Sequence, residues 1–141
     1  MAKFERMTTI YRNLTTGTYY VQPYTRGPVA ATEFGDSTVI HSTEFEENIA
    51  DAILENIERF GTERYEKARA IRRDDDGQRA FLKEHVGVGV SEHASGGLVV
   101  HSLHREKGGM VGSNEDVFLV SKEEIPQKLT ATVAEAFKRA T

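Results

Sequence analysis

Hydrophobic and polar positions alternate along two short runs near the start of the chain, Met7 to Leu14 and Thr18 to Gln22. Both runs are rich in β-branched and aromatic residues, and Thr15-Thr16-Gly17 separates them, which is typical of a β-hairpin. A further short run from Thr38 to His41 has the same character. The first part of the sequence therefore predicts three successive strands.

The pattern then changes to a helical period. Apolar residues recur every three or four positions at Phe45, Ile49, Ile53, Ile57 and Phe60. Thr43 and Glu46 are spaced for a capping box, and Gly61 is a stop signal. This pattern predicts a helix that begins near residue 43 and ends near residue 60.

A strongly charged region follows this helix. The run from Glu63 to Arg73 predicts a second helix, which ends at Asp74-Asp75-Asp76-Gly77. The run from Gln78 to His85 predicts a short third helix.

The second half of the chain repeats the order of the first. It predicts a strand from Val86 to Glu92, a turn at Ser95-Gly96-Gly97, a strand from Leu98 to Leu103, a glycine-rich loop to Asn114, a strand from Asp116 to Val120, and a terminal helix. An ungapped alignment of the halves places Gly17 on Gly96 and Ser42 on Ser121. Two β-β-β-α repeats, over about residues 7–61 and 86–140, are one interpretation. We expect a single α+β domain over residues 1–141, with a largely antiparallel sheet and helices packed on one face.

Composition narrows the class of protein. The chain has 141 residues, which fits one domain with one core, and no apolar run approaches the roughly 20 residues of a membrane-spanning helix. It has no cysteine, which excludes disulfides and thiolate metal sites. The start of the chain, from Met1 to Arg6, has no apolar signal segment. We therefore expect a cytoplasmic protein without membrane contacts.

The candidate motifs for chemistry are weak. His101 and His104 are three apart on or near a strand, so their side chains point to opposite faces, and neither they nor His93 has a carboxylate neighbour that would complete a metal site. The glycines of 86–90 lie inside a predicted strand, and no Lys-Ser/Thr pair follows those of 108–112, so neither stretch fits a phosphate-binding loop. No catalytic motif is present. We expect no cofactor and no enzyme, although a site assembled across the chain stays an alternative.

The charge distribution is more informative than the net charge of −4. Between Arg26 and Arg59 there is no Lys or Arg, and eight acidic residues fall in that segment. Several of them step by three or four along the first predicted helix and form one stripe beside its apolar face. With the Asp74-Asp75-Asp76 run, these acids are the candidate partner-binding residues: Glu44, Glu47, Asp51, Glu55, Glu58, Asp74, Asp75 and Asp76.

Two interpretations of this stripe are open. Like charges at this spacing cost an isolated helix roughly 0.2–0.5 kcal/mol per pair, which favours a functional reason for them, namely docking of a basic partner. Alternatively, the stripe is a solvated face, or arginines of residues 64–73 neutralise it within the molecule.

Several segments of the second half resemble one family. They are Phe81-Leu-Lys, Val86-Gly-Val-Gly-Val, Gly97-Leu-Val-Val-His, Glu115-Asp-Val-Phe-Leu-Val-Ser and the run that starts at Glu123-Glu-Ile-Pro-Gln-Lys-Leu. The pattern resembles the immunity proteins of bacterial contact-dependent growth inhibition systems, the CdiI type. The resemblance lies mostly in residues 78–140 and carries over no residue as a contact.

The resemblance implies a cytoplasmic immunity protein that binds the C-terminal toxin domain of a cognate CdiA effector, as a 1:1 heterodimer, and blocks it without turnover. Such toxins are commonly nucleases with basic clefts. Because the immunity protein would bind the toxin itself, we do not expect this chain to contact nucleic acid directly. The alternative from another class is a nucleic-acid-binding or regulatory module that uses the basic segment 59–83, with Tyr24 and His104 as stacking residues.

Overall fold

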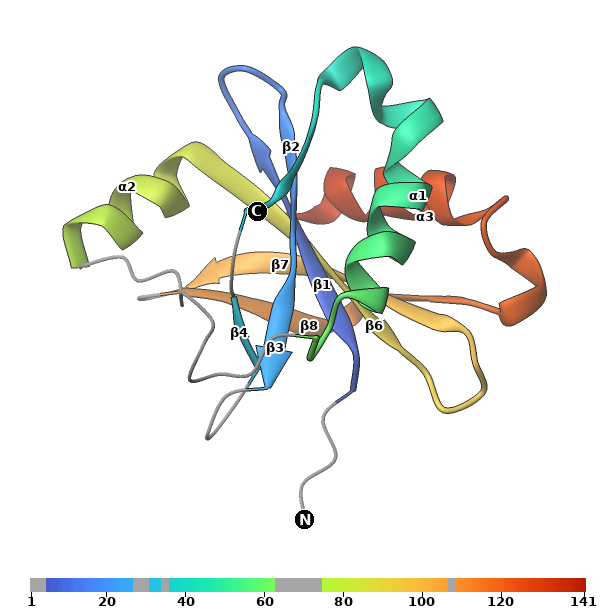
Figure 1. Cartoon of the computed structure of the whole chain (residues 1–141). Helices are drawn as coiled ribbons and strands as arrows, with labels where there is room; N and C mark the ends of the chain where they lie inside the picture. The colour runs from blue at the N-terminus through green and yellow to red at the C-terminus, as the bar shows by residue number, and fades with distance from the viewer. Residues whose placement is uncertain (1–4, 27–30, 34–35, 63–74, 107–108) are drawn as a thin grey trace.

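The computed structural model describes residues 5–26, 31–33, 36–62, 75–106 and 109–141. The fold is α+β, as the sequence predicts, and its main sheet is antiparallel (Figure 1). In chain order the elements are β1 (Met7–Asn13), β2 (Tyr19–Gln22), β3 (Tyr24–Arg26), β4 (Ala31–Glu33), β5 (Thr38–Ile40), a 3-10 turn η1 (Ser42–Glu44), α1 (Phe45–Glu58), α2 (Asp75–Glu84), β6 (His85–Glu92), β7 (Leu98–Glu106), β8 (Gly109–Val120), a 3-10 turn η2 (Lys122–Glu124) and α3 (Leu129–Arg139).

Six strands form the main sheet in the order β5-β2-β1-β6-β7-β8. The central pair is β1 and β6, which are antiparallel, with Ile10 opposite Val88. Strands from the first half of the chain lie on one side of this pair, and strands from the second half lie on the other. This order is compatible with two β-β-β-α units, but the duplication itself stays a prediction.

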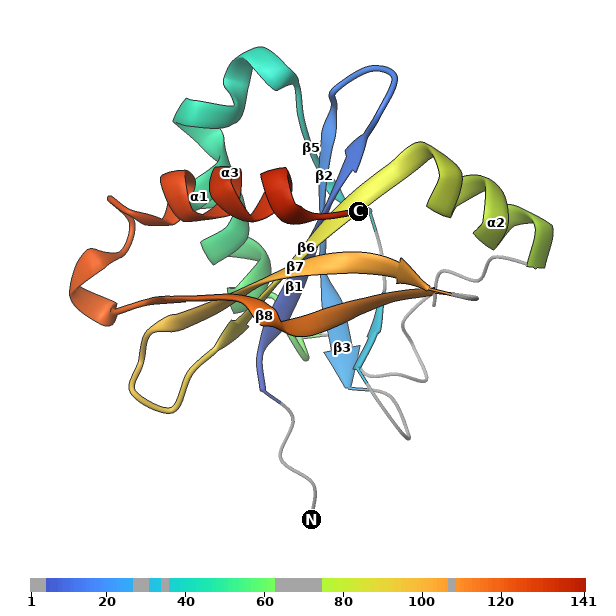
Figure 2. The same ribbon diagram turned by 180° about the vertical axis from the view of Figure 1, so that it is seen from behind.

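Two helices cover one face of the sheet. α1 lies over β1, β2 and β5, and α3 lies over β6, β7 and β8 (Figures 1 and 2). The core fills the space between them because alternate strand residues point to the same face. Its fully buried side chains include Ile10, Val21, Ile49, Ile53, Val88, Val100, Leu129 and Val133.

The alternation of valine and glycine in β6 suits its two faces. Val86, Val88 and Val90 are buried toward the helices. Gly87 faces the other side, where a Cβ atom would come within 2.9 Å of the Met110 sulfur. A side chain at this position would displace Met110, so glycine permits close packing on the second face.

The second face of the sheet is also covered in part, in addition to the face on which α1 and α3 pack. The side chain of Phe81 in α2 packs edge-on against Tyr11 of β1, with ring centroids 4.8 Å apart. The β3–β4 pair closes over the same region, since the hydroxyl groups of Tyr24 and Thr9 lie 2.8 Å apart. The centre of the sheet is therefore enclosed on both sides.

Several predicted elements change in the structure. The glycine-rich stretch before Asn114 belongs to β8, so the predicted loop is wrong there. α2 begins at Asp75, so residues 75–77 start a helix where the sequence predicts a helix end. The turn before α1 is closed by Glu44, whose carboxylate accepts the His41 N–H, and not by Thr43 and Glu46. The predicted helix from Glu63 to Arg73 lies entirely outside the described residues.

Candidate partner-binding surface

α1 is fixed to the molecule by its apolar side. Phe45, Ile49, Ile53 and Ile57 are all buried against the sheet or α3, as the helical period predicts. α1 ends at Glu58, and the turn that follows contains Gly61, which has a φ of 73° and donates its N–H to the Tyr24 carbonyl at 3.3 Å. Only glycine adopts this left-handed conformation without strain, so the stop signal is confirmed.

The opposite side of α1 carries its acids. Because residues three and four apart share one side of a helix, four carboxylates project together from the exposed side. We call this surface the acidic face of α1; it consists of the exposed residues Glu47, Asp51, Glu55 and Glu58. The structure therefore brings together four of the predicted residues on one surface. A fifth, Glu44, lies in η1 and is half-buried, with its carboxylate engaged by His41.

Most of the acidic face has no neutralising partner within the described part of the chain. No Lys, Arg or His side chain there lies within ion-pair distance of Glu47, Asp51 or Glu55. The arginines of residues 64–73 lie outside the described residues, so the structure does not test the neutralised interpretation. Three carboxylates on adjacent turns, without a cation beside them among the described residues, give this surface a negative potential.

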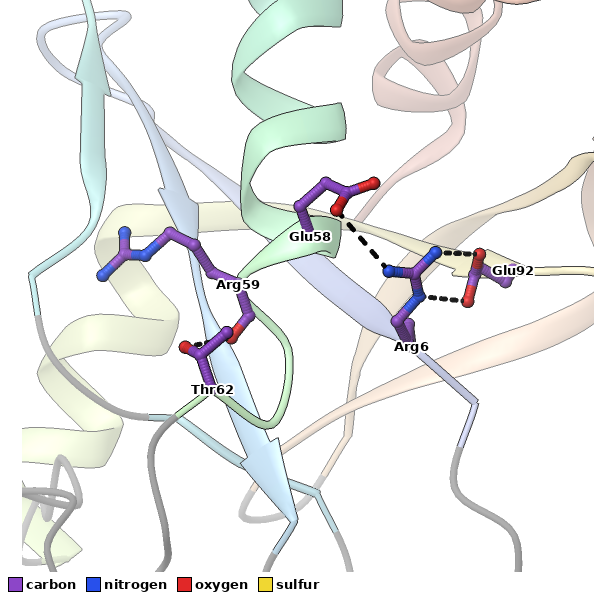
Figure 3. Close-up of polar contacts among 5 residues, drawn as sticks. All are labelled: Arg6, Glu58, Arg59, Thr62 and Glu92. Carbon is purple, nitrogen blue, oxygen red and sulfur yellow. Dashed lines mark hydrogen bonds and ion pairs between the residues drawn. The ribbon is translucent and has the colours of Figure 1, made fainter.

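One cation borders the acidic face at its end. An Nη1 atom of Arg6 lies 3.9 Å from a carboxylate oxygen of Glu58, whereas the same guanidinium makes much shorter contacts to Glu92 (Figure 3). Arg59 is adjacent in the chain but points away from Glu58, and its Nη1 donates to the Asn56 amide oxygen at 3.3 Å. Arg6 therefore marks the boundary of the negative surface, which extends from Glu58 along α1 toward the N-terminus of the helix.

The run Asp74-Asp75-Asp76 does not continue this surface where it is described. Asp74 lies outside the described residues, and Asp75 and Asp76 begin α2. α2 and α1 lie at separate sides of the molecule in both views (Figures 1 and 2). The reason is topological, because α2 leads into the central strand β6 and packs on the sheet face that α1 does not cover.

The two residues that would stack on bases in the nucleic-acid hypothesis are less accessible than base stacking requires. Tyr24 is 8% exposed and its hydroxyl is bonded within the fold, so its ring is not free to stack on a base. His104 is also engaged, as described below. Much of the basic segment, residues 63–74, lies outside the described residues.

Within the part of the chain that the structure describes, the histidines do not gather into a metal site. The described residues contain no group of three or more His, Asp or Glu side chains that could hold a metal ion. His104 instead joins a polar cluster that sequence reasoning missed: its Nε2 lies 2.8 Å from Asp116 and its Nδ1 lies 2.7 Å from the Thr141 hydroxyl. Arg139 lies 3.6 Å from the same Asp116 carboxylate. The contacts join β7, β8 and the end of α3, which no local spacing in the sequence reveals.

None of the helices in the described part of the chain is long and apolar enough to cross a membrane.

Comparison with known proteins finds similarity in structure but none in sequence. No protein-family model matches the chain, and no curated protein matches its sequence. The chain is similar in structure to NMB0488 from Neisseria meningitidis, a protein of unknown function, with a TM-score of 0.72 and full coverage of both chains. The two sequences are 11% identical, so the likeness shows a shared fold and nothing about activity.

Proposed function

We propose that this protein is an immunity protein, which binds a toxin domain with a basic surface and neutralises it. The observation that carries the proposal is the acidic face of α1, where Glu47, Asp51 and Glu55 are exposed without a described cation beside them. A purely structural helix would gain from Lys or Arg at these positions. The absence of such residues supports selection for binding.

The charge of this surface suits a nuclease as the target. A nuclease binds phosphate groups through Lys and Arg, so its substrate cleft is positive. A row of carboxylates on a rigid helix offers negative charges at regular spacing and attracts such a cleft over distances up to the screening length. The resemblance of residues 78–140 to immunity proteins of contact-dependent growth inhibition systems supports the same class of partner. Binding is proposed to be 1:1, in the cytoplasm of the protected cell.

The direct test uses, as candidate toxin, the C-terminal domain of the protein encoded immediately upstream of the gene for this chain. We expect tight 1:1 binding in titration calorimetry and restored growth of cells that express the toxin domain. Neither binding nor rescue would overturn the proposal. In that case, affinity for bare RNA or DNA with a steep salt dependence would favour the nucleic-acid alternative instead.

Charge reversal on α1 tests the surface. The triple variant Glu47→Lys, Asp51→Lys, Glu55→Lys should weaken toxin binding by about tenfold to a thousandfold, since it replaces attraction by repulsion. The matched control is Glu84→Lys, Glu106→Lys, Glu123→Lys, which changes the net charge equally at exposed acids outside α1. An equal loss in both variants would mean that overall charge, and not this surface, governs binding.

A further inference from the structure

β8 forms one edge of the main sheet, and it is much longer than the strand at the other edge. It spans 12 residues, whereas β5 spans 3. Figure 2 shows β8 running along the border of the sheet below α3. An edge strand presents unpaired backbone N–H and C=O groups, which are a template for pairing with another strand.

The side chains at the end of this edge strand are apolar, whereas edge strands are usually protected against pairing by charged side chains. Val117 and Leu119 are 38% and 60% exposed, on the sheet face that α1 and α3 do not cover. Phe118 and Val120 point to the helix face. Natural edge strands are commonly protected by Lys, Pro or an inward charge. The only charged residue from 116 to 120 is Asp116, whose carboxylate is already engaged by His104 and Arg139.

We propose that β8 pairs antiparallel with β8 of a second copy of this chain, about a twofold axis at Phe118. This register places Val117 of each copy opposite Leu119 of the other. The twofold axis therefore produces two identical Val117–Leu119 contacts. Directly opposed residues of an antiparallel pair share a face, so all four exposed apolar side chains meet on the open face of the joined sheet. The pairing also covers the exposed edge from residue 116 to residue 120.

The unequal edges select a closed dimer over an open chain of molecules. A head-to-tail assembly would have to pair β8 with β5, whose three residues match only a small part of β8. Pairing of β8 with itself about Phe118 aligns residues 116–120 of the two copies and closes after two copies.

The charges near the axis are compatible with this arrangement. Arg139 lies over the Phe118 ring, 5.2 Å from its centroid, and would approach its equivalent across the axis. Each Arg139 brings its own counter-charge, because Asp116 lies 3.6 Å away. The acidic face of α1 lies over the opposite half of the sheet, so the two acidic faces stay far apart and accessible. The dimer therefore does not depend on the proposed function and does not obstruct it.

Sedimentation analysis of the full chain tests the dimer. We expect twice the mass of 15.8 kDa at micromolar concentration for the wild-type chain, and loss of the dimer for Leu119→Lys. The matched control is Val39→Lys, which adds the same charge at a 52% exposed position on the same sheet face but on β5. It should leave the dimer intact. A wild-type monomer up to hundreds of micromolar, or equal effects of the two variants, would overturn the proposal.

Disulfide trapping tests the register without a disruptive charge. The natural chain has no cysteine, so Val117→Cys and Leu119→Cys each introduce a single thiol. Opposed Cα atoms in an antiparallel pair lie about 4.5–5.5 Å apart, within the range that a disulfide spans. A mixture of the two variants should cross-link much faster than either alone, and Val39→Cys should not cross-link. If the mixture does not cross-link, or if the chain stays monomeric and Leu119→Lys instead abolishes toxin binding, a partner strand occupies β8 and the proposal is wrong.

Discussion

Arg6 and Glu92 are 86 positions apart in the chain and form a two-pronged ion pair. Nε and Nη2 of Arg6 donate to the two carboxylate oxygens of Glu92 at 2.6 and 2.7 Å (Figure 3). The backbone N–H of Glu92 also donates to the Arg6 carbonyl at 2.9 Å. The pair therefore continues the β1–β6 ladder by one step and anchors the residue that precedes β1.

Glu92→Gln should lower stability, and more at neutral than at acidic pH. The hydrogen bond from Arg6 lowers the pKa of Glu92 in the folded state. An unfolded glutamate titrates near pH ~4.3, so the stabilisation is present above that value and is lost as the pH falls through the lower folded-state pKa. Both side chains are more than a third exposed, with 38% and 35% of their surface accessible, so solvent screens the pair. We expect Glu92→Gln to lower the free energy of unfolding by about 0.5–1 kcal/mol at neutral pH.

Urea unfolding at about pH 7 and about pH 3 measures this difference. Glu106→Gln is the control, because Glu106 is exposed and makes no ion pair with a described residue. A loss for Glu92→Gln that does not change with pH would show that packing, and not the charge of Glu92, stabilises this junction.

Gly97→Ala should be among the most damaging small substitutions. A Cβ atom at Gly97 would lie 2.4 Å from the Val120 carbonyl oxygen and 3.2 Å from the Ser121 Cα, so backbone atoms would have to move. We expect a loss of about 1–3 kcal/mol in the free energy of unfolding. At Gly89 the nearest atom to an added Cβ is a Leu103 methyl carbon at 3.7 Å, an ordinary contact. Gly89→Ala should therefore change the unfolding midpoint little, and equal losses would contradict the argument.

The strands and helices with a clear period could be predicted from sequence. The Val-Gly alternation at 86–90 lies within β6, and the period of Ile49, Ile53 and Ile57 gives the buried side of α1. The start of β8 could not be predicted, because Gly109 and Gly112 have low strand propensity. They are paired because β7 supplies a ladder, with Leu103 opposite Gly112 and Glu106 opposite Gly109. Tertiary pairing overrides local propensity there.

The candidate site divides in the same way. The acidic face of α1 follows from spacing alone, since a helix whose apolar side is buried must expose the other. The contact of Arg6 with Glu58 does not follow from spacing, because it requires the β1–β6 register that brings Arg6 beneath the end of α1. Tyr24 has the pattern of an exposed strand end, but β3 and β4 fold it over Thr9 and bury it.

Tyr24→Phe should destabilise the attachment of β3 and β4 to the sheet. The hydroxyl of Tyr24 lies 2.8 Å from the Thr9 hydroxyl and donates to Glu33 at 3.3 Å, and Thr9 is 4% exposed. Loss of a buried hydrogen bond that leaves a partner unsatisfied costs about 1–2 kcal/mol. Tyr20→Phe is the control, since the Tyr20 hydroxyl has no hydrogen bond to any described residue. Urea unfolding at neutral pH compares the two.

Alkaline pH adds a second readout for the same variant. Burial, together with the nearby Glu33 charge, raises the pKa of Tyr24. The neutral phenol is favoured in the folded state, so this contribution is complete below the unfolded pKa of about 10 and is lost as the pH rises above it. Tyr24→Phe should therefore lose less stability at alkaline pH than the wild-type chain. An identical alkaline decline would mean that the Tyr24 phenol does not resist ionisation.

Asp51→Lys should make the isolated chain more stable and a poorer binder. Asp51 is exposed at the centre of the acidic face, four residues after Glu47 and four before Glu55. The substitution turns two repulsive pairs into two attractive ones, worth about 0.5–1.5 kcal/mol together in the free energy of unfolding. It also places a positive charge where the proposed toxin would bring its own, so calorimetry should show weaker binding. Glu106→Lys should change neither quantity appreciably. A gain in stability with unchanged affinity would assign the acids to a solvated surface, because natural proteins are rarely at their stability optimum and tolerate such repulsion.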